Sequence, residues 1–232
     1  MIIRMKHQFL LTIFLSGTML LPGQTPANPG SGTFTDARDG RAYKTVTLGK
    51  QVWMAENLAY LPAVNFVGEA GFEDACYYVY GYNGKNIAEA AAKEACMKYG
   101  TLYNWKAATI SCPDGWHLPT DAEWRELEKH LGMEYEPLSR SWIGSGAVGK
   151  KIRSAEGWKM GNATGESGFN ALPAGCRGYS GFESMGFCGY FWTATPSGSD
   201  NGWRRGFCGD NDGSCREEDR KYFGISVRCV KN

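Results

Sequence analysis

The sequence lacks an excess of charge of either sign, and after its first 22 residues it also lacks long apolar runs. Its 25 Lys and Arg residues balance 24 Asp and Glu residues. Proteins that bind nucleic acid phosphates carry a basic excess, so we expect no nucleic-acid partner. Glycine is frequent, with 31 residues among 232, and 13% of the residues are aromatic. This composition predicts one loop-rich α+β domain with short strands and a sizeable core.

Common signatures of metal and catalytic sites are also missing. No two cysteines have the C-x-x-C spacing, and His117 and His130 are the only histidines after residue 27, which argues against a zinc site. The sequence has no Gly-x-Ser-x-Gly motif, no phosphate-binding loop and no paired catalytic carboxylates. We therefore expect no catalytic residue, no cofactor and no bound metal.

Residues 1–27 have the pattern of a cleaved export signal. Arg4 and Lys6 supply the positive start, residues 9–21 form the apolar run, and residues 25–27 form a small-residue cleavage site. The apolar run is shorter than the roughly 20 residues that span a membrane, which favours a cleaved signal over a membrane anchor. We expect export to the periplasm, the outer cell surface or the medium, with no stable membrane span after cleavage.

The rest of the chain is expected to form a linker at residues 28–33 and one domain at residues 34–232. Alternating apolar and polar residues predict strands, and Ala-rich or amphipathic stretches predict helices. The strands in the late half predict an antiparallel sheet against which the helices pack. The predicted strands are residues 43–48, 51–54, 169–175, 190–195, 203–208 and 224–230, and the predicted helices are residues 86–99, 121–131 and 147–154.

Residues 112–132 contain the element around which the chain is organised. A Pro-Asp-Gly turn leads into a short extended stretch and then into a helix. Thr120 and Glu123 are spaced as a capping box, and Trp124 begins an apolar stripe that faces a core. We expect His117 to make structural hydrogen bonds and not to act in catalysis. The residues with expected structural roles are Trp116, His117, Thr120, Glu123 and Trp124.

Seven short motifs stand out along the chain. They are Phe-Thr-Asp at 34–36, Trp-Met-Ala-Glu-Asn-Leu at 53–58, Tyr-Gly-Thr-Leu-Tyr-Asn-Trp at 99–105, Gly-Trp-His-Leu-Pro-Thr at 115–120, Gly-Phe-Asn-Ala-Leu-Pro at 168–173, Phe-Trp-Thr at 191–193 and Gly-Ile-Ser-Val-Arg-Cys-Val at 224–230. In this order they resemble the Fibrobacter succinogenes major paralogous domain. The resemblance implies an exported bacterial protein with a C-type-lectin-like fold, related to the formylglycine-generating enzymes. For most members of that family no activity is established.

The eight cysteines of an exported chain are expected to form disulfides. Their spacing alone leaves many connectivities open. The resemblance implies a Cys112–Cys229 bond, because C-type-lectin-like domains tie an early element to the last strand. For the remaining cysteines we expect local bonds, namely Cys76–Cys96, Cys176–Cys188 and Cys208–Cys215.

The sequence Arg-Arg-Gly-Phe-Cys that ends at Cys208, together with Cys215, is similar to the run that carries two copper-binding thiols in formylglycine-generating enzymes. Soft thiolates suit copper(I), so a copper or thiol oxidase is an alternative function. A structural disulfide is favoured, because the six residues between the two cysteines have a turn composition. Asp210, Asp212 and Ser214 alternate on that turn, but calcium requires more oxygen ligands on a rigid frame.

Residues 197–221 are turn-rich and of mixed charge, and in the implied fold the loops between the late strands face outward. Mixed charge suits a polar ligand or a protein surface. We expect a non-catalytic binding or adhesion module for an extracellular protein or glycan; a structural cell-surface subunit is the other alternative. If Trp203 belongs to the core, this region is instead a passive cap. The expected contact residues are Trp203, Arg204, Arg205, Asp210, Asp212 and Arg216.

Overall fold

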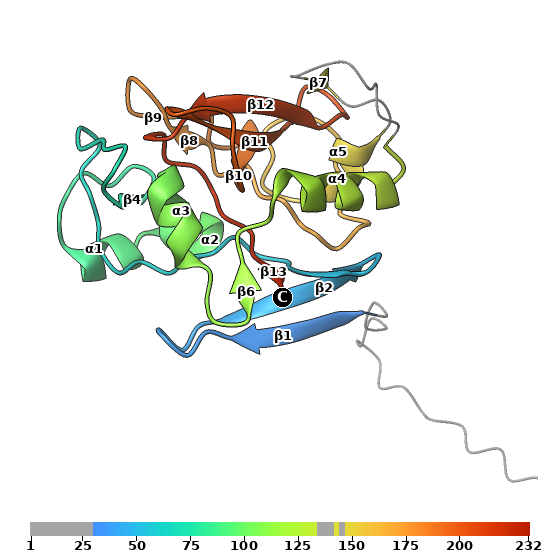
Figure 1. The fold of residues 1–232 in the computed structure, drawn as a ribbon, viewed down its shortest axis with the longest axis horizontal. Helices are drawn as coiled ribbons and strands as arrows, with labels where there is room; N and C mark the ends of the chain where they lie inside the picture. Colours follow the sequence, from blue (N-terminus) through green and yellow to red (C-terminus); the bar gives the residue numbers. More distant parts are fainter. Residues whose placement is uncertain (1–29, 134–141, 144–146) are drawn as a thin grey trace, which may run out of the picture.

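The structure, a computed structural model, describes residues 30–133, 142–143 and 147–232 (Figure 1). The predicted export signal lies outside the described residues. The helices are α1 (Ile87–Ala91), α2 (Glu94–Tyr99), α3 (Trp105–Ser111), α4 (Asp121–His130) and α5 (Val148–Ile152). The strands are β1 (Ser31–Thr35), β2 (Ala42–Leu48), β3 (Gln51–Met54), β4 (Tyr77–Tyr78), β5 (Leu102–Tyr103), β6 (Trp116–His117), β7 (Trp142–Ile143), β8 (Cys176–Arg177), β9 (Phe182–Glu183), β10 (Cys188–Pro196), β11 (Asn201–Cys208), β12 (Cys215–Arg220) and β13 (Val230–Lys231).

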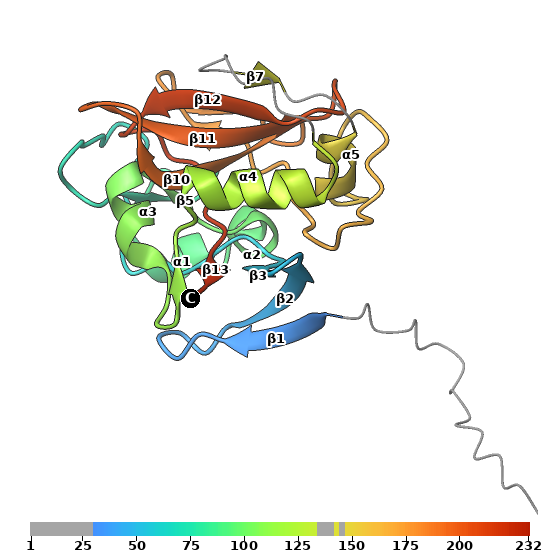
Figure 2. The same cartoon turned by 45° about the vertical axis from the view of Figure 1, so that its right-hand side comes forward.

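Two antiparallel sheets frame the domain, and α4 lies between them in both views (Figure 1; Figure 2). The first sheet has the strand order β1-β2-β3-β13-β6, so the beginning and the end of the described chain share one sheet. The second sheet has the order β10-β11-β12-β7, and there are two further two-stranded sheets, β4-β5 and β8-β9. The described residues therefore confirm a mixed α and β architecture with small antiparallel sheets.

Trp124 of α4 fills the space between the two sheets. Its ring centroid lies 5.0 Å from that of Trp53 in β3, and 5.9 and 6.2 Å from those of Phe191 in β10 and Phe207 in β11. The ring of Phe169 joins this cluster at 5.5 Å, and all five side chains are fully buried. Tilted rings at such separations attract one another beyond their burial, so the cluster holds α4 against both sheets.

Helix α4 begins where the sequence predicts. The Thr120 hydroxyl accepts from the backbone N–H of Glu123 at 3.2 Å, and the Glu123 carboxylate accepts from the N–H of Thr120 at 2.7 Å, so the capping box is confirmed. His117 supports this cap, because its Nε2 lies 2.7 Å from Glu123 Oε1 and its Nδ1 lies 2.6 Å from Asn232 Oδ1. Both ring nitrogens of His117 therefore have structural partners, and the neighbouring Trp116 is buried.

The last segment of the chain is anchored by Arg228, which is fully buried. Its guanidinium donates to Asn57 Oδ1 at 2.9 Å and to the backbone oxygens of Met54 at 3.2 Å and Asn170 at 2.7 Å. It also donates to the carbonyl of Phe169 and lies 4.6 Å from the centroid of the Phe169 ring. Burial lowers the pKa of Arg228 to about 9. These acceptors replace the water that a buried cation loses.

The predicted linker is shorter than expected, because residues 31–33 belong to β1. Ser31 pairs with Val46 and Thr33 pairs with Lys44 across the β1–β2 ladder. The ladder satisfies the backbone of this polar segment, so its composition does not prevent a strand.

The helix predicted at residues 86–99 is divided into α1 and α2. Asn86 caps α1 as expected, since its side chain accepts from the backbone N–H of Glu89 at 3.2 Å. Ala90 and Cys96 are six residues apart, which would place them about 120° apart around one straight helix. The break allows both side chains to be buried.

Three further elements differ from the prediction. Residues 224–229 make only single bridges, including Tyr103 with Ile225 and Phe191 with Ser226, because this segment crosses from one sheet to the other. Residues 169–175 likewise make only isolated bridges. Helix α3 was not predicted; its first turn is capped by Asn104, which accepts from the N–H of Ala107 at 2.9 Å.

Two disulfides are present among the described residues, and one was predicted. Cys112–Cys229 is confirmed, with its Cα atoms 5.9 Å apart. The predicted Cys176–Cys188 and Cys208–Cys215 bonds are wrong, because Cys188 and Cys208 stand opposite each other in the β10–β11 register and are bonded together. Cys176 and Cys215 are free thiols.

The predicted Cys76–Cys96 bond is also wrong. Cys76 lies beside Asn104, with which it exchanges hydrogen bonds at 2.9 and 3.0 Å. The sulfur of Cys96 lies 4.0 Å from the hydroxyl of Thr101. Thr101 and Asn104 are three residues apart in extended chain, which places them about 10 Å from each other. A disulfide requires much closer Cα atoms, so both cysteines remain buried thiols.

We predict that Trp124→Ala lowers the free energy of unfolding by about 3–5 kcal/mol, because it opens a cavity where the two sheets meet. Thr120→Ala should cost only about 1 kcal/mol, since one cap acceptor is lost. Trp124→Phe is the control: it keeps an aromatic ring and removes an indole N–H that has no hydrogen-bond partner among the described residues, so its cost should be intermediate. Equilibrium denaturant unfolding measures all three, and equal small losses would contradict the central role of this ring.

Candidate binding surface

Two arginines of the predicted contact surface lie in the interior. Arg205 is fully buried and donates to Glu128 Oε1 and to Asp121 Oδ1, each at 2.8 Å. Arg216 is also buried and donates to the same Asp121 oxygen at 2.7 Å. The hydroxyl of Ser214 donates to Glu128 at 2.7 Å. The prediction is therefore wrong for Arg205 and Arg216, which attach β11 and β12 to α4 through ion pairs.

Strand alternation explains this placement. Arg205 and Arg216 stand opposite each other in the β11–β12 register, and opposite residues share one face of a sheet. That face points toward α4. Burial alone would raise the pKa of the Asp121 carboxyl, but hydrogen bonding to Arg216 and the charge of Arg205 lower it. Because β12 pairs along β11, residues 197–221 are largely sheet and not the outward loop that we expected.

Arg204 points to the opposite face of β11, where its charge is also neutralised. Its guanidinium lies 2.6 Å from Glu217 Oε2, contacts the carboxylate of Asp219, and lies 4.4 Å from the centroid of the Tyr190 ring. The Arg204 side chain is only 11% exposed. A partner would therefore meet the carboxylates around Arg204 more readily than Arg204 itself.

Asp210 and Asp212 are the exposed members of the predicted contact surface. Asp212 accepts a hydrogen bond from the buried Arg153 at 3.0 Å, yet its own side chain is 52% exposed. Trp203 is half-buried, and the guanidinium of Arg216 lies 3.4 Å from its ring centroid. The predicted residues therefore fall into two groups. Asp210 and Asp212 form an exposed acidic tip, and the others belong to the frame of the domain.

A different surface brings together aromatic rings from three loops. Phe72 precedes β4, Tyr179 lies in the turn between β8 and β9, and Tyr222 and Phe223 follow β12. Ring centroids are 5.0 Å apart for Phe72 and Tyr222, 5.9 Å for Tyr179 and Tyr222, and 4.8 Å for Tyr179 and Phe223. Phe223 is buried, whereas Tyr179 is 72% exposed. We call these four residues the aromatic patch.

The aromatic patch has no signature in the sequence, because its members are far apart in the chain. No periodicity or motif connects position 72 with positions 179 and 222. Figure 1 shows β4, β8, β9 and the end of β12 on the same side of the molecule. The richness of residues 61–84 in Tyr and Phe was the one available signal.

Arg177 holds the three loops of the aromatic patch together. It is 5% exposed, and its Nε donates to the carbonyl of Val67 at 2.9 Å. Its Nη1 donates to the carbonyl of Tyr222 at 3.4 Å, and its backbone exchanges two hydrogen bonds with Gly224. The guanidinium also lies 5.2 Å from the centroid of the Tyr78 ring. One buried cation therefore fixes the backbone that carries the exposed rings.

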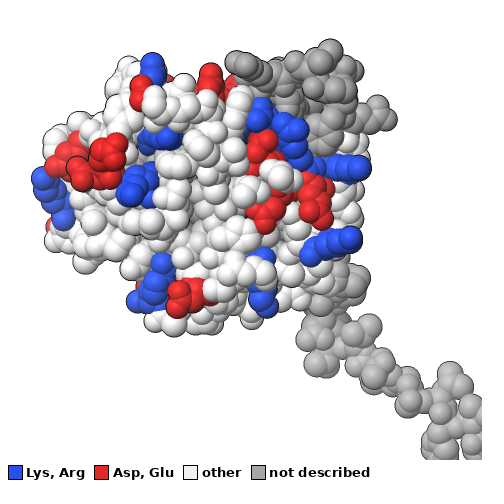
Figure 3. All heavy atoms as spheres, viewed as in Figure 1, with Lys and Arg blue, Asp and Glu red and all other residues white. Residues whose placement is uncertain are grey.

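Charged groups of both signs border the aromatic patch. Arg220 pairs with Asp200 at 3.4 Å, and both side chains are exposed. Side-chain hydrogen bonds with Tyr222 and Arg220 lower the pKa of Tyr179. Acidic and basic side chains also lie next to one another over the face seen in Figure 3, with no large area of one sign. The patch therefore combines apolar rings with hydrogen-bonding groups.

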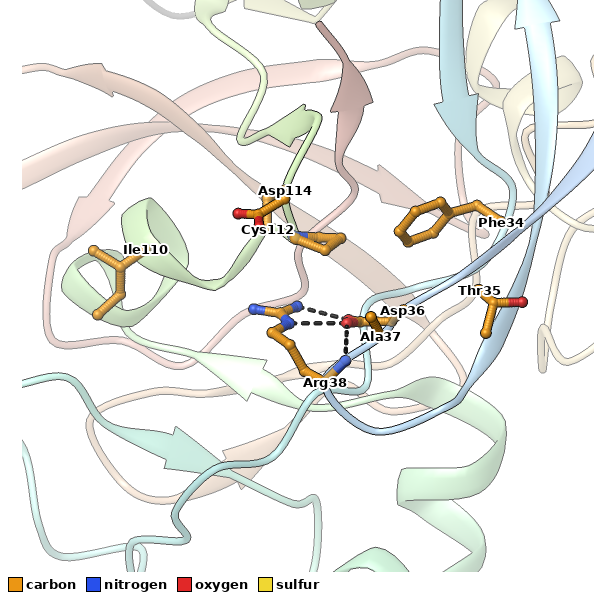
Figure 4. Close-up of a pocket in the computed structure, with 9 residues that line it drawn as sticks. Phe34, Thr35, Asp36, Ala37, Arg38, Ile110, Cys112 and Asp114 are labelled. Atoms are coloured by element: carbon orange, nitrogen blue, oxygen red, sulfur yellow. Dashed lines mark hydrogen bonds and ion pairs between the residues drawn. The ribbon is translucent and has the colours of Figure 1, made fainter.

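A small pocket lies elsewhere, beside the central turn (Figure 4). It has a volume of about 290 Å³ and is lined in part by Phe34, Ile110 and Asp114. Arg38 also lines it but is engaged by Asp36, whose carboxylate accepts from Arg38 Nε at 2.9 Å and Nη2 at 2.7 Å. This volume is at the lower limit of pockets that enclose small ligands, so the pocket is a weaker candidate than the aromatic patch.

A comparison with protein families identifies the Fibrobacter succinogenes major domain, whose family model matches residues 46–231. The chain belongs to this family. No curated protein and no solved structure is significantly similar to the chain. The matched range contains the aromatic patch, the ionic contacts of α4 and both disulfides.

Two features are absent from the described residues: a group of metal-binding side chains and a membrane-spanning helix. The described residues contain no group of three or more His, Cys, Asp or Glu side chains that could hold a metal ion. Within the same ranges, no helix has the length and apolar character needed to cross a membrane.

We predict that Arg205→Ala lowers the free energy of unfolding by roughly 3–5 kcal/mol, because it removes a cation that pairs with the buried Glu128 carboxylate. Arg220→Ala removes an exposed ion pair of the neighbouring strand and should cost less than about 1 kcal/mol. Denaturant unfolding of both variants provides the comparison. Similar small costs would show that Arg205 does not attach the sheet to α4.

Proposed function

We propose that the chain is an exported, non-catalytic binding module whose aromatic patch contacts an extracellular protein or glycan. The observation that carries this proposal is the exposure of Tyr179 on a cluster of rings whose backbone is held by the buried Arg177. A ring that served only the core would be covered, and exposed apolar clusters bordered by polar groups are typical of interaction sites.

The chemistry of the patch supports recognition. Tyrosine supplies a large apolar face and a hydroxyl, and Tyr and Arg are among the residues that most often carry binding energy. Arg177 fixes the loops before a partner arrives, which lowers the entropy cost of ordering them on binding. Tyr179 and Phe72 are the exposed anchors, and Arg220 and Asp200 are the neighbouring polar contacts.

Export is supported by the pattern of residues 1–27 and by the two disulfides, which are typical of oxidising compartments. We also propose that the frame is C-type-lectin-like. In support, the first and last described strands share one sheet, and Cys112–Cys229 ties the central turn to the end of the chain.

The alternative function as a copper or thiol oxidase has less support. It requires Cys208 and Cys215 to act together as thiols, but Cys208 is bonded to Cys188. A structural cell-surface subunit also uses exposed rings, but it would bury them permanently against its neighbours. Reversible binding by the isolated domain distinguishes a binding module from such a subunit.

The experiment compares four versions of residues 28–232 on a glycan array and on a panel of purified extracellular proteins. We predict that Tyr179→Ala weakens binding to the ligand found for the unmodified domain by about 30-fold, as expected for the loss of a binding hot spot of about 2 kcal/mol. The melting temperature should be unchanged, because this side chain is mostly exposed.

Phe187→Ala is the matched control, since Phe187 is another exposed ring, 43% exposed, that packs against Lys159 outside the patch. It should bind as the unmodified domain does. Unchanged affinity for Tyr179→Ala, with loss instead for a variant that lacks the Asp210 and Asp212 carboxylates, would place the site at the acidic tip.

A further inference from the structure

Three cysteines lie on one face of the second sheet, and a fourth lies in β8, beside the edge strand β10. Cys188 stands opposite Cys208 in the β10–β11 register, and Cys215 stands opposite Gly206 in the β11–β12 register. Residues two apart on a strand share a face, so Cys208 and Gly206 point to the same side, and Cys215 joins them there. Cys215 is therefore the diagonal neighbour of Cys208.

Cys176 occupies the corresponding position on the other side of the disulfide. Gly175 forms a parallel bridge with Gly189, and its N–H donates to the carbonyl of Cys188 at 2.9 Å. Cys176 belongs to the apolar cluster against which Tyr190 packs, and Tyr190 shares a face of β10 with Cys188 because the two are two residues apart. Cys176 therefore lies on the side of β10 that carries Cys188. The order from β8 across β10 and β11 to β12 is Cys176, Cys188, Cys208 and Cys215, with a bond between the middle two and a thiol at each end.

Their surroundings keep the two outer cysteines in the thiol form. Burial and then the Glu183 carboxylate raise the pKa of Cys176 to about 12. Burial and then Glu217 raise the pKa of Cys215, although this residue is partly exposed. Because the thiolate is the attacking species, both cysteines can persist beside a disulfide without reacting.

We propose that these four cysteines form a thiol–disulfide exchange site that reacts with a low-molecular-weight disulfide, so that Cys188–Cys208 is replaced by Cys208–Cys215 and Cys176–Cys188. Diagonal neighbours have Cα atoms about 7–8 Å apart, and a disulfide needs at most about 6.8 Å, so each outer pair has to approach slightly. The β11–β12 pairing ends at Gly206 and Cys215, which leaves residues 209–214 outside the ladder.

The exchange proceeds in three balanced steps. Cys215 gives its proton to solvent, and its thiolate attacks the sulfur of Cys208, which forms Cys208–Cys215 and releases Cys188 as a thiolate. Cys188 then attacks the small disulfide, forms a mixed disulfide and releases one small thiolate. Cys176 loses its proton and attacks the Cys188 sulfur, which forms Cys176–Cys188 and releases the second small thiolate. The protons lost by Cys215 and Cys176 complete two small thiols, so two cysteines are oxidised and one small disulfide is reduced.

The new bonds constrain different parts of the molecule. The observed bond joins β10 and β11, which the sheet already holds in register. After exchange, one bond closes the acidic tip that carries Asp210 and Asp212. The other attaches β8 to β10, and β8 leads directly into the turn that carries Tyr179. Oxidation at this site would therefore tether both the acidic tip and the turn that carries Tyr179.

The test is disulfide mapping of residues 28–232 before and after incubation with oxidised glutathione at about pH 8.5, because an alkaline pH increases the thiolate fraction of Cys215 and Cys176, whose pKa values are raised. Free thiols are first alkylated, and the protein is digested with trypsin and with a protease that cleaves at aspartate, because Asp210 and Asp212 are needed to separate Cys208 from Cys215. Before incubation we expect Cys188–Cys208 with Cys176 and Cys215 alkylated. Afterwards we expect Cys208–Cys215 and Cys176–Cys188.

Cys215→Ser removes the first nucleophile and should keep Cys188–Cys208 intact, whereas Cys96→Ser, which removes a thiol outside the site, should still allow the exchange. Circular dichroism verifies that each variant is folded. Retention of Cys188–Cys208 in the treated, folded, unmodified protein would overturn the proposal. So would a product in which glutathione remains attached to Cys215 and no new cysteine pair has formed.

Discussion

The burial of Arg228 is the constraint on which the rest of the structure depends. A guanidinium without a carboxylate partner in the interior is costly unless acceptors surround it. Here the acceptors are the Asn57 side chain and the carbonyls of Met54, Phe169 and Asn170, which come from two parts of the chain far from Arg228 in sequence. Asn170 adopts a positive φ of 54°, a conformation that Asn tolerates better than most residues and that occurs where its carbonyl meets the cation. The chain therefore has to bring its beginning, its middle and its end together before Arg228 is satisfied.

Helix α4 extends this arrangement to the second sheet by two kinds of contact. Trp124 supplies the apolar contact, since its ring touches both sheets. Asp121 and Glu128 supply the ionic contact with Arg205 and Arg216. The charges on the inner face of β11 and β12 therefore hold the domain together. For this reason residues 197–221, whose charged sequence resembles a recognition loop, contribute much of their charge to the interior. Recognition is left to the rings around Tyr179, which the frame supports through Arg177.

Much of the local structure was predictable from short-range chemistry. The Thr120 and Glu123 box, the Asn86 cap and the strands near Tyr43 and Trp53 depend on neighbours within a few residues, and all are present. The candidate site was predictable only in part: Asp210 and Asp212 are exposed, whereas Arg205 and Arg216 are not. Successive residues of a β-strand point to opposite faces of the sheet, so a shift of one residue moves a side chain from solvent to the interior. The sequence alone does not show whether Arg205 points to solvent or to the interior; the pairing of β12 with β11 decides it.

The sequence by itself determined the balance of charge, the positions of turns and helix caps, and membership of the Fibrobacter succinogenes major domain family, because these depend on residue types and on their order. Only the tertiary structure decided which cysteines are bonded, since a disulfide requires two Cα atoms to be adjacent in space and strand register placed Cys188, not Cys215, opposite Cys208. It also decided that Phe72, Tyr179 and Tyr222 form one surface. Their contact arises from loops that Arg177 gathers across more than one hundred residues, a distance over which no sequence pattern carries information about proximity.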